Sequence, residues 1–521
     1  MYGDMIHLRR RALIVGGGPA GLATLRNLVQ LSRFDCVKLV ERRDNIGGVW
    51  YLDDPDLAID EGNQRPRWPS PAYPGLVGNV LPEYLSFAGF PFPEPQTAPD
   101  EPFPSLQETQ AYLQAFAKPF LDNGSIRLNV EVTRVEELPG EAGWNVVMKD
   151  WNEGLEGGEI MECWDAVVVC VGWHDSPSWP DIDGLEELRH KGLALHAKSW
   201  RGAEGFENKR ALVIENQNAT VDMATSLSRL CQTPIYRNVL HTNSIARLDD
   251  SRVEDILHVK HVRSRLGASY TQHQIDFGTI EEESDKIVVT LEDGTEIEEI
   301  DVVFVDTGYR PHADIVSVFV PNDATQSLVP LPSLIAPTDT HHRIPCLYRH
   351  ILYTYNPTLA FIGAATASLP FVMADLSSLW LALTWNGEIP LPRTPDDRML
   401  YERELLVEIE SKHRDEMGRG VPSSSTDSTL GERETQFAAD LRRDVVLARP
   451  EKGKVLLQWD EGLEKAKEGM FSAKLRALEW AKIKRSMIVY EGNGIPLSGK
   501  GVAERISGTS PGGEGGGPRS C

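Results

Sequence analysis

At 521 residues the chain is longer than one ordinary domain, so two or three domains are expected. Its 53 Lys and Arg residues face 77 Asp and Glu residues, and the net charge of −24 argues against nucleic acid or an anionic membrane as the main partner. The six cysteines show no CxxC and no metal-ligand spacing, and no apolar run approaches the roughly 20 residues of a membrane span. We therefore expect a cytoplasmic protein with no metal site and no membrane span.

A buried strand followed by a glycine-rich turn is the first strong pattern along the chain. Residues 12–15 are apolar, and Gly16, Gly18 and Gly21 follow in the spacing GxGxxG. Residues 22–31 then carry the 3.6-residue apolar period of a helix. This order of strand, glycine turn and helix is typical of a dinucleotide-binding fold.

A second strand, residues 37–40, completes the pattern because it ends at Glu41, about 20 residues after Gly21. In such a fold Gly16 allows the tight turn, and Gly18 lets backbone N–H groups approach a diphosphate. Gly21 lets helix and strand pack closely, and Glu41 is placed to accept hydrogen bonds from a ribose. A glycine turn without a ligand is the alternative.

Two loops and a helix follow. Residues 45–50 contain paired glycines and a tryptophan, which suit either close approach to a flat ligand or a plain turn with a core side chain. Residues 73–79 lead into an aromatic and proline-rich stretch, residues 84–93. Ser105 and Glu108 then form the sequence of a capping box, which predicts the start of an amphipathic helix.

The order GxGxxG, Glu, GGxW, YxxLxxN, FxxFPFP and YLxxFA, within residues 10–392, resembles the flavin-containing monooxygenase family of class B flavoprotein monooxygenases. In that family a first dinucleotide fold binds FAD and a second, inserted fold binds NADPH. The resemblance places Asn79 beside the reactive face of the flavin, as the catalytic residue; an ordinary turn asparagine is the alternative. It implies FAD-contacting positions at Gly16, Gly18, Ala20, Gly21, Glu41, Val49, Trp50, Asn79 and Val132.

The second fold departs from the family at its glycine turn. Between a strand at 210–214 and a helix beginning at 221–224, the family has GxGNSG and this chain has residues 215–220, with all three glycines replaced. Glu215 adds a negative charge where a diphosphate would lie; like charges 4 Å apart repel by about 4 kcal/mol at an effective dielectric of 20. Weakened NADPH binding, another reductant or none, and a site taken over by substrate are all compatible with this turn.

Arg237 ends a predicted strand, where the resemblance implies a contact with the 2′-phosphate of NADPH; a solvent-exposed arginine is the alternative. The linker pattern His190-x-Gly-xxx-His196-xxx-Trp200 is a hybrid of the flavin-containing and Baeyer–Villiger monooxygenase fingerprints. We interpret His196 as an orienting linker residue. Asp306 replaces the small residue that the family has before Thr-Gly-Tyr, so local contacts there are expected to differ.

The expected fold class is α/β, with two dinucleotide-binding (Rossmann-like) domains, the second inserted in the first, and a helical C-terminal extension. The expected units are 1–185 and 301–392 for the two parts of the FAD-binding domain, 186–300 for the inserted NADPH-domain-like fold, 393–506 for the extension with a linker at 418–431, and 507–521 for a disordered tail.

The resemblance implies an FAD-dependent monooxygenase that passes one oxygen from O₂, through a C4a-hydroperoxyflavin, to a small organic substrate of the kind met in secondary metabolism. N-oxygenation, S-oxygenation and hydroxylation are the expected reactions, with FAD as cofactor and NADPH as the questioned reductant. Three alternatives stay open: an FAD oxidase or dehydrogenase reduced by its own substrate, a Baeyer–Villiger monooxygenase, and a flavin-binding protein without turnover. The sequence leaves the oligomeric state open.

Overall fold

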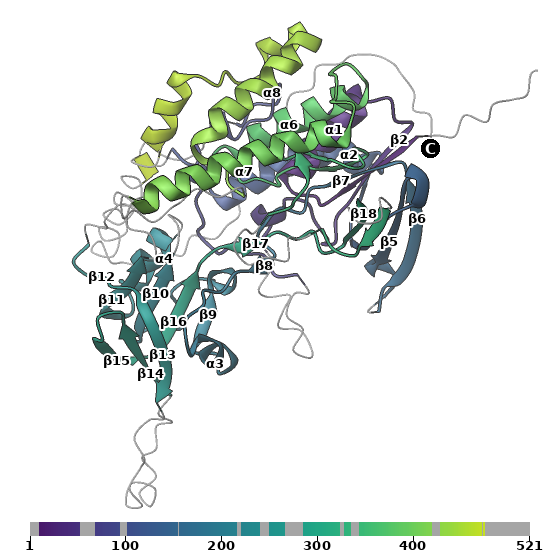
Figure 1. Ribbon diagram of the computed structural model, residues 1–521. Coiled ribbons are helices and arrows are strands. Elements are labelled where there is room, and N and C mark those ends of the chain that lie inside the picture. Colours follow the sequence, from purple (N-terminus) through teal and green to yellow (C-terminus); the bar gives the residue numbers. More distant parts are fainter. Residues whose placement is uncertain are drawn as a thin grey trace, which may run out of the picture.

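The computed structural model describes residues 10–52, 68–93, 102–154, 156–215, 220–239, 250–265, 285–322, 328–334, 343–418, 428–470 and 473–474. These residues form a mixed α/β fold built on two sheets with parallel strands, as Figure 1 shows. The predicted tail at 507–521 lies outside the described residues, as does most of the predicted linker at 418–431.

The larger sheet has the strand order β20-β21-β22-β7-β1-β2-β3, and its strands from β22 to β3 run parallel. β1 lies in the interior of this sheet, between β7 and β2, and is apolar on both faces: Ala12 and Ile14 belong to one core cluster, and Leu13 and Val15 belong to another. The strands are β1 (Arg11–Val15), β2 (Cys36–Val40), β3 (Ile126–Arg127), β7 (Ala166–Val169), β20 (Leu347–Tyr348), β21 (Leu352–Tyr353) and β22 (Leu359–Phe361).

Helices cover one face of this sheet, and a second, mainly antiparallel sheet packs on the other through the second core cluster. The helices are α1 (Pro19–Leu31), α2 (Leu106–Asp122) and α6 (Pro370–Trp385). The second sheet, in the order β19-β18-β4-β5-β6, consists of β4 (Val130–Glu137), β5 (Trp144–Asp150), β6 (Gly158–Trp164), β18 (Val316–Pro321) and β19 (Leu328–Leu331).

The chain between the short paired strands β8 (Ser176–Pro177) and β17 (Tyr309–Arg310) forms a separate lobe around a wholly parallel sheet of order β12-β11-β10-β16-β9. Figure 1 shows this lobe below the larger sheet. Its elements are α3 (Leu185–His190), β9 (Ala194–His196), β10 (Arg210–Glu215), α4 (Thr220–Leu227), β11 (Gln232–Val239), β12 (Val253–Ile256), β13 (Val259–Arg265), β14 (Lys286–Leu291), β15 (Glu296–Ile300) and β16 (Val302–Asp306).

The C-terminal extension contains α7 (Pro395–Gly418), α8 (Glu434–Ala448) and a further helical stretch at 461–470. It joins the same core cluster as α1 and α6, because Leu441, Val445 and Trp459 pack into that cluster. α6 is therefore buried around most of its circumference, with α1 and α8 packed against it. The extension is continuous with the core of the larger sheet.

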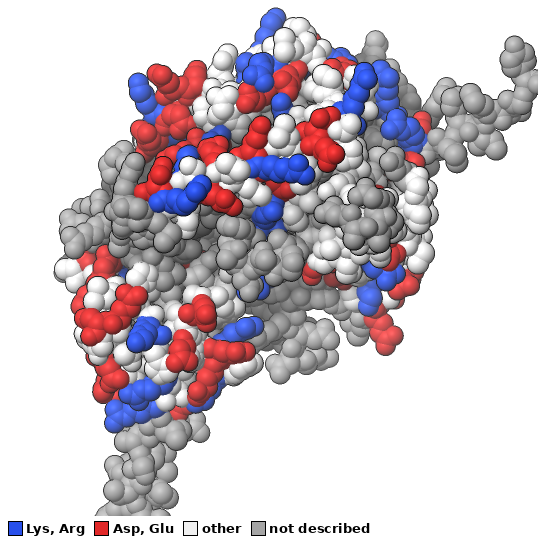
Figure 2. Space-filling view, in the orientation of Figure 1, with Lys and Arg blue, Asp and Glu red and all other residues white. Residues whose placement is uncertain are grey.

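Short 3₁₀ turns connect several elements: η1 (Gly48–Trp50), η2 (Pro82–Tyr84), η3 (Pro139–Glu141), η4 (Trp151–Glu153), η5 (Ala197–Ser199), η6 (Gly431–Arg433) and η7 (Pro450–Lys454). Among the described residues, no helix has the length and apolarity needed to cross a membrane. Acidic and basic side chains alternate over the face of the molecule in Figure 2, so that face presents no field of a single sign.

Candidate functional site

The glycine turn between β1 and α1 has room for no side chain at two of its positions. Gly16 has a φ of +104°, and a Cβ built on it would lie 2.8 Å from the carbonyl oxygen of Cys170. A Cβ on Gly21 would lie 1.9 Å from the carbonyl oxygen of Gly16. Both glycines are thus required by the turn and by the packing of helix on strand, as the sequence predicts.

The N-terminus of α1 is open to an anion. Its N-cap is Gly18, which offers no capping side chain, and the first turn contains no acidic residue. A Cβ on Gly18 would meet only Gly48, at 3.6 Å, so the fold itself does not require glycine there. Free N–H groups and the positive end of the helix dipole suit a phosphate, so the turn fits a diphosphate cofactor.

Glu41 lies directly after β2 with 7% of its surface exposed. One carboxylate oxygen accepts a hydrogen bond from the N–H of Gly17 at 2.6 Å, and the other accepts one from the N–H of Arg43 at 2.9 Å. Each oxygen keeps a second lone pair, so a ribose hydroxyl can still donate to it. The ribose contact stays a prediction, and the structure adds that Glu41 holds the glycine turn in place.

The second glycine loop packs on the first. The N–H of Gly47 donates to the carbonyl of Gly17 at 2.9 Å, and the following η1 contains Val49 and Trp50, both partly buried. The Trp50 ring makes an edge contact with Phe371 of α6, at 6.3 Å between centroids. The structure thus brings this loop, the first turn of α1 and the start of α6 together.

Ala20 and Val132 lie on opposite faces of the larger sheet. Ala20 is partly buried in the first turn of α1. Val132 on β4 is 8% exposed and packs in the core cluster between the two sheets. Its contact with FAD, which the resemblance implies, stays a prediction.

Asn79 lies in a loop that is clamped to the beginning of α2. Gly78 donates its N–H to Pro104 at 2.8 Å, and Leu106 donates to the carbonyl of Leu76 at 3.0 Å. The predicted capping box at Ser105 is confirmed, because its side chain accepts from the N–H of the third helical residue and the glutamate there accepts in return. The Asn79 side chain is exposed and thus accessible to a ligand.

In the lobe between β8 and β17, two neighbouring parallel strands, β10 and β16, each end at an acidic residue. In the register of β10 and β16, Glu215 lies opposite Asp306. Burial raises the pKa of the Asp306 carboxyl to about 6, so it is still ionised at pH 7. Residues 216–219 of the altered turn lie outside the described residues.

Arg237 is 1% exposed, in the interior of β11, so the alternative of a solvent-exposed arginine is wrong. Its Nε donates to one oxygen of Asp255 at 2.6 Å, and one terminal nitrogen donates to the other oxygen at 2.9 Å. The contact with a 2′-phosphate stays a prediction. Sequence reasoning missed the Asp255 partner, since nothing in the pattern indicated that β12 pairs with β11.

His196 lies at the base of the lobe, beside Tyr309 of β17. Its Nδ1 accepts from the N–H of Lys198 at 3.1 Å, and its Nε2 lies 3.1 Å from the carbonyl of Gly308, which fits a neutral ring protonated on Nε2. Burial lowers the pKa of His196 to about 4, although its backbone hydrogen bonds oppose the shift. Its position agrees with the interpretation of an orienting residue.

An ion cluster that sequence reasoning missed braces the same junction. Arg42 makes two hydrogen bonds to the carboxylate of Asp175, at 3.1 and 2.9 Å, and Lys198 donates to that carboxylate at 3.1 Å. Burial alone would raise the pKa of Asp175, but Arg42 and Lys198 hold it well below its ordinary value. The cluster therefore ties the end of β2, beside Glu41, to the linker that contains His196.

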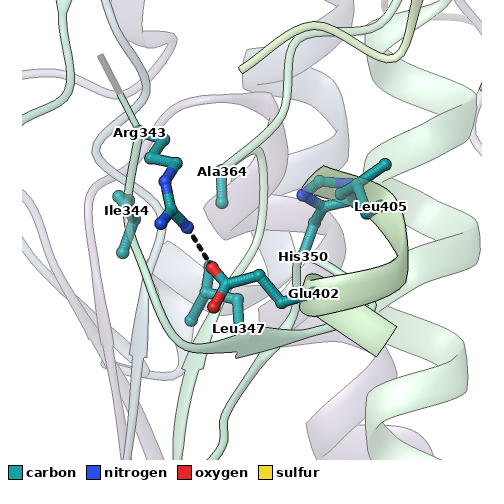
Figure 3. Close-up of a pocket in the computed structure, with 7 residues that line it drawn as sticks. All are labelled: Arg343, Ile344, Leu347, His350, Ala364, Glu402 and Leu405. Carbon is teal, nitrogen blue, oxygen red and sulfur yellow. Dashed lines mark hydrogen bonds and ion pairs between the residues drawn. The ribbon is translucent and has the colours of Figure 1, made fainter. Parts of the chain in front are cut away.

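A small pocket lies between the β20 segment and α7 (Figure 3). Glu402 forms an ion pair with Arg343 across it and accepts a hydrogen bond from the N–H of Cys346 at 2.8 Å. Its free space holds about one water molecule and is too small for an organic substrate. The lining residues are Arg343, Ile344, Leu347, His350, Ala364, Glu402 and Leu405.

Together, the parallel sheet, the glycine turn and the uncapped helix define a protein with a cofactor-binding turn of the dinucleotide type. The model of the family described as "Flavin-binding monooxygenase-like" matches residues 9–263. The chain is similar to this family of flavin-dependent enzymes over that stretch, which is just under half of its length.

Two curated relatives from Arabidopsis thaliana are similar over most of the chain. Flavin-containing monooxygenase FMO GS-OX-like 1 is 27% identical over 461 residues, which cover 87% of this chain and 84% of that protein. Flavin-containing monooxygenase FMO GS-OX2 is 25% identical over 403 residues, which cover 75% of this chain and 77% of that protein.

Two solved structures share the fold. S-allyl-L-cysteine S-oxygenase from Allium sativum has a TM-score of 0.61 at 23% identity, covering 89% of this chain and 98% of that one. Tmm from Pelagibacter sp. strain HTCC7211 has a TM-score of 0.60 at 18% identity, covering 85% of this chain and 90% of that one. The α/β class with parallel sheets is thereby confirmed.

Proposed function

We propose that the protein is an FAD-dependent monooxygenase that transfers one oxygen atom from O₂ to nitrogen or sulfur of a small organic molecule. In this proposal residues 1–185 and 301–392 form a dinucleotide-binding domain for FAD, and residues 186–300 form an inserted domain for NADPH. The observation that carries the proposal is the glycine turn, because Gly16 and Gly21 have no room for a Cβ and α1 begins uncapped. The family match supports it independently.

The residues of the site bind and orient a cofactor that supplies the redox chemistry itself when it is bound. The N–H groups at the start of α1 would hold its diphosphate, and Glu41 would accept from its ribose. Asn79 offers an exposed amide that can donate a hydrogen bond to a reacting oxygen. The aromatic contact between Trp50 and Phe371 would help to exclude water from one wall of the site.

A soft nucleophile is the proposed substrate class. The name of the Allium sativum neighbour describes an S-oxygenase, which supports sulfur as one acceptor. Trp200, the residue shared with the Baeyer–Villiger fingerprint, is 4% exposed and contacts Phe304 at 5.3 Å between centroids. Packing thus accounts for Trp200 without a ketone substrate.

Anaerobic mixing of the FAD-loaded protein with NADPH or NADH, followed through flavin absorbance, tests the reductant. We expect bleaching by NADPH, followed on addition of ¹⁸O₂ and substrate by a product heavier by one labelled oxygen. If the protein does not bind FAD on reconstitution, the whole proposal is refuted. Flavin that no reduced nicotinamide bleaches would refute the NADPH half alone.

A flavoprotein oxidase or dehydrogenase reduced by its own substrate is the second candidate. It is favoured by the adjacent Glu215 and Asp306, which place two acidic residues at the ends of β10 and β16. Anaerobic bleaching by an amine or thiol substrate alone, with no effect of NADPH, would establish it. Asp306→Ala separates the two candidates further, since removing this charge should tighten NADPH binding severalfold only if NADPH occupies that edge.

A further inference from the structure

A buried lysine of the C-terminal extension contacts the loop that contains Asn79. Lys474 is 5% exposed, and its Nζ donates to the carbonyls of Val77 at 2.8 Å and Gly78 at 2.9 Å. The ammonium also lies 5.7 Å from the centroid of the Phe103 ring. These contacts join residues almost 400 positions apart and end directly before Asn79.

The loop is held from both sides. The beginning of α2 binds one edge, through the hydrogen bonds of Gly78 with Pro104 and of Leu106 with Leu76, and Lys474 binds the two carbonyls that follow. A two-sided clamp restricts the backbone at the residue before Asn79. The position of the exposed Asn79 amide is therefore set by this restrained backbone.

Burying an ammonium group is costly unless strong acceptors replace water. Two carbonyls and an aromatic face do so for Lys474, and an apolar side chain of similar length would leave both carbonyls without this donor. Packing alone is therefore a poor explanation for a lysine at this place. The charge has a specific task, which is to fix two carbonyl groups.

A second buried charge of the extension holds another loop in the same way. Glu434 is 1% exposed and accepts hydrogen bonds from the N–H groups of Ser368 at 2.9 Å and Leu369 at 3.2 Å, where α6 begins. Next to it, the N–H of Thr366 donates to the carbonyl of Ser428 at 2.8 Å, and the carbonyl of Thr366 accepts from the N–H of Leu430 at 2.9 Å. The extension thus clamps both the start of α6, which contacts Trp50, and the Asn79 loop.

We propose that Lys474 is a positioning residue for the oxygen-transfer reaction, and that the C-terminal extension supports the active site from outside. Lys474 acts through Val77 and Gly78, setting the place of the Asn79 amide relative to the flavin without touching cofactor or substrate. The inference rests on the proposed function for its chemical consequence. Its structural half, the clamp on the loop, stands on geometry alone.

Three full-length variants test the proposal: Lys474→Met, Lys474→Arg and a matched control, Arg442→Met. Arg442 is also a cation of the extension that donates to a backbone carbonyl, that of Gly453 at 2.9 Å, but it makes this contact inside the extension. Each variant is measured by amide hydrogen exchange of the Gly78 and Leu106 N–H groups, by the Kd for FAD, and by the ratio of oxygenated product to released hydrogen peroxide.

Lys474→Met should speed exchange at Gly78 and Leu106 by about tenfold, because the loop loses two hydrogen bonds from a charged donor. The Kd for FAD should stay within about twofold, because the diphosphate turn is untouched, while the product-to-peroxide ratio falls severalfold. Lys474→Arg should restore both exchange and ratio in part. Arg442→Met should change stability without changing either.

Unchanged exchange in Lys474→Met would overturn the clamp. Faster exchange with an unchanged product-to-peroxide ratio would overturn the positioning role. A drop in the ratio in Arg442→Met as large as in Lys474→Met would mean that general destabilisation explains the effect. A wild-type protein that binds no FAD would overturn the proposed function while the exchange result still decides the clamp.

Discussion

Asp375 of α6 is buried and forms an ion pair with Arg26 of α1. Its carboxylate also accepts hydrogen bonds from the side chain of Asn27 at 2.9 Å and from the N–H of Ala88 at 2.7 Å. One side chain thus joins two helices and the aromatic loop that follows the Asn79 segment. A buried carboxylate with so many donors stabilises the fold only while all of them are present.

Asp375→Ala is expected to lower the free energy of unfolding by about 3–5 kcal/mol, because it leaves the Arg26 charge buried without its partner. Urea denaturation followed by circular dichroism measures the change. Asp122→Ala is the matched control, since the ion pair of Asp122 with Lys118 is exposed and should contribute less than about 1 kcal/mol. Equal effects in the two variants would contradict a special role for Asp375.

Gly18→Ala and Gly21→Ala are expected to separate cofactor binding from folding. A methyl group on Gly18 meets only Gly48 at 3.6 Å, and the φ of Gly18 is −74°, so the folded protein should lose less than about 1 kcal/mol. Its Kd for FAD should rise at least about tenfold because the methyl group occupies the approach of the diphosphate. Gly21→Ala should instead prevent stable folding, since its Cβ would lie 1.9 Å from a carbonyl oxygen.

Titration of FAD fluorescence and thermal unfolding without FAD check this pair of variants. Gly469→Ala is the control, because a Cβ there has no atom within 4 Å and the position lies in a helix. An FAD Kd unaffected by Gly18→Ala would contradict the assignment of the diphosphate to this turn.

Asp306→Asn is expected to stabilise the protein more at high pH than at low pH. The pKa of Asp306 is raised to about 6 in the folded state, so the folded protein pays for ionising it as the pH rises from the unfolded value near 4. The advantage of the variant should therefore grow to as much as about 3 kcal/mol by pH 7.5 and fall below about 1 kcal/mol at pH 4. Chemical denaturation across this range measures it, and an advantage independent of pH would refute the shift.

His196→Gln is expected to show the opposite dependence. The pKa of His196 is lowered to about 4 by burial, so below pH 6.5 the unfolded wild type binds a proton that the folded state does not. The wild type should lose about 2 kcal/mol relative to the variant between pH 7 and pH 5. Glutamine keeps an N–H that can donate to Gly308, so the comparison isolates the titration. Parallel stability curves for the two proteins would show that His196 titrates normally.

The local pattern of the first 41 residues predicted its structure well, because each element there depends on near neighbours. A strand buried on both faces, glycines at Gly16 and Gly21, and an acid after β2 are all features of one local strand–turn–helix–strand unit. The capping box at Ser105 is likewise a matter of four consecutive residues. Such features are visible without knowledge of the remaining chain.

The contacts that sequence reasoning missed are all distant in sequence. Arg237 has the composition of a phosphate ligand, but pairing of β11 with β12 gives it Asp255 as a partner. Lys474 is one of many basic residues in the sequence, and only the folding of the chain brings it to Val77, 397 positions away. A single sequence, without the covariation seen in an alignment, contains no information about such long-range contacts.

The dependence of α6 on the extension has a consequence for biosynthesis. α6 is apolar around nearly its whole surface, and one of its flanks is covered only when α8 and the segment up to Met470 have been made. A nascent chain that has been synthesised only as far as α6 therefore exposes an apolar helix, because the segments that cover it are still missing. Such a chain is expected to bind chaperones. Stable loading of the flavin should accordingly follow synthesis of the segment up to Met470.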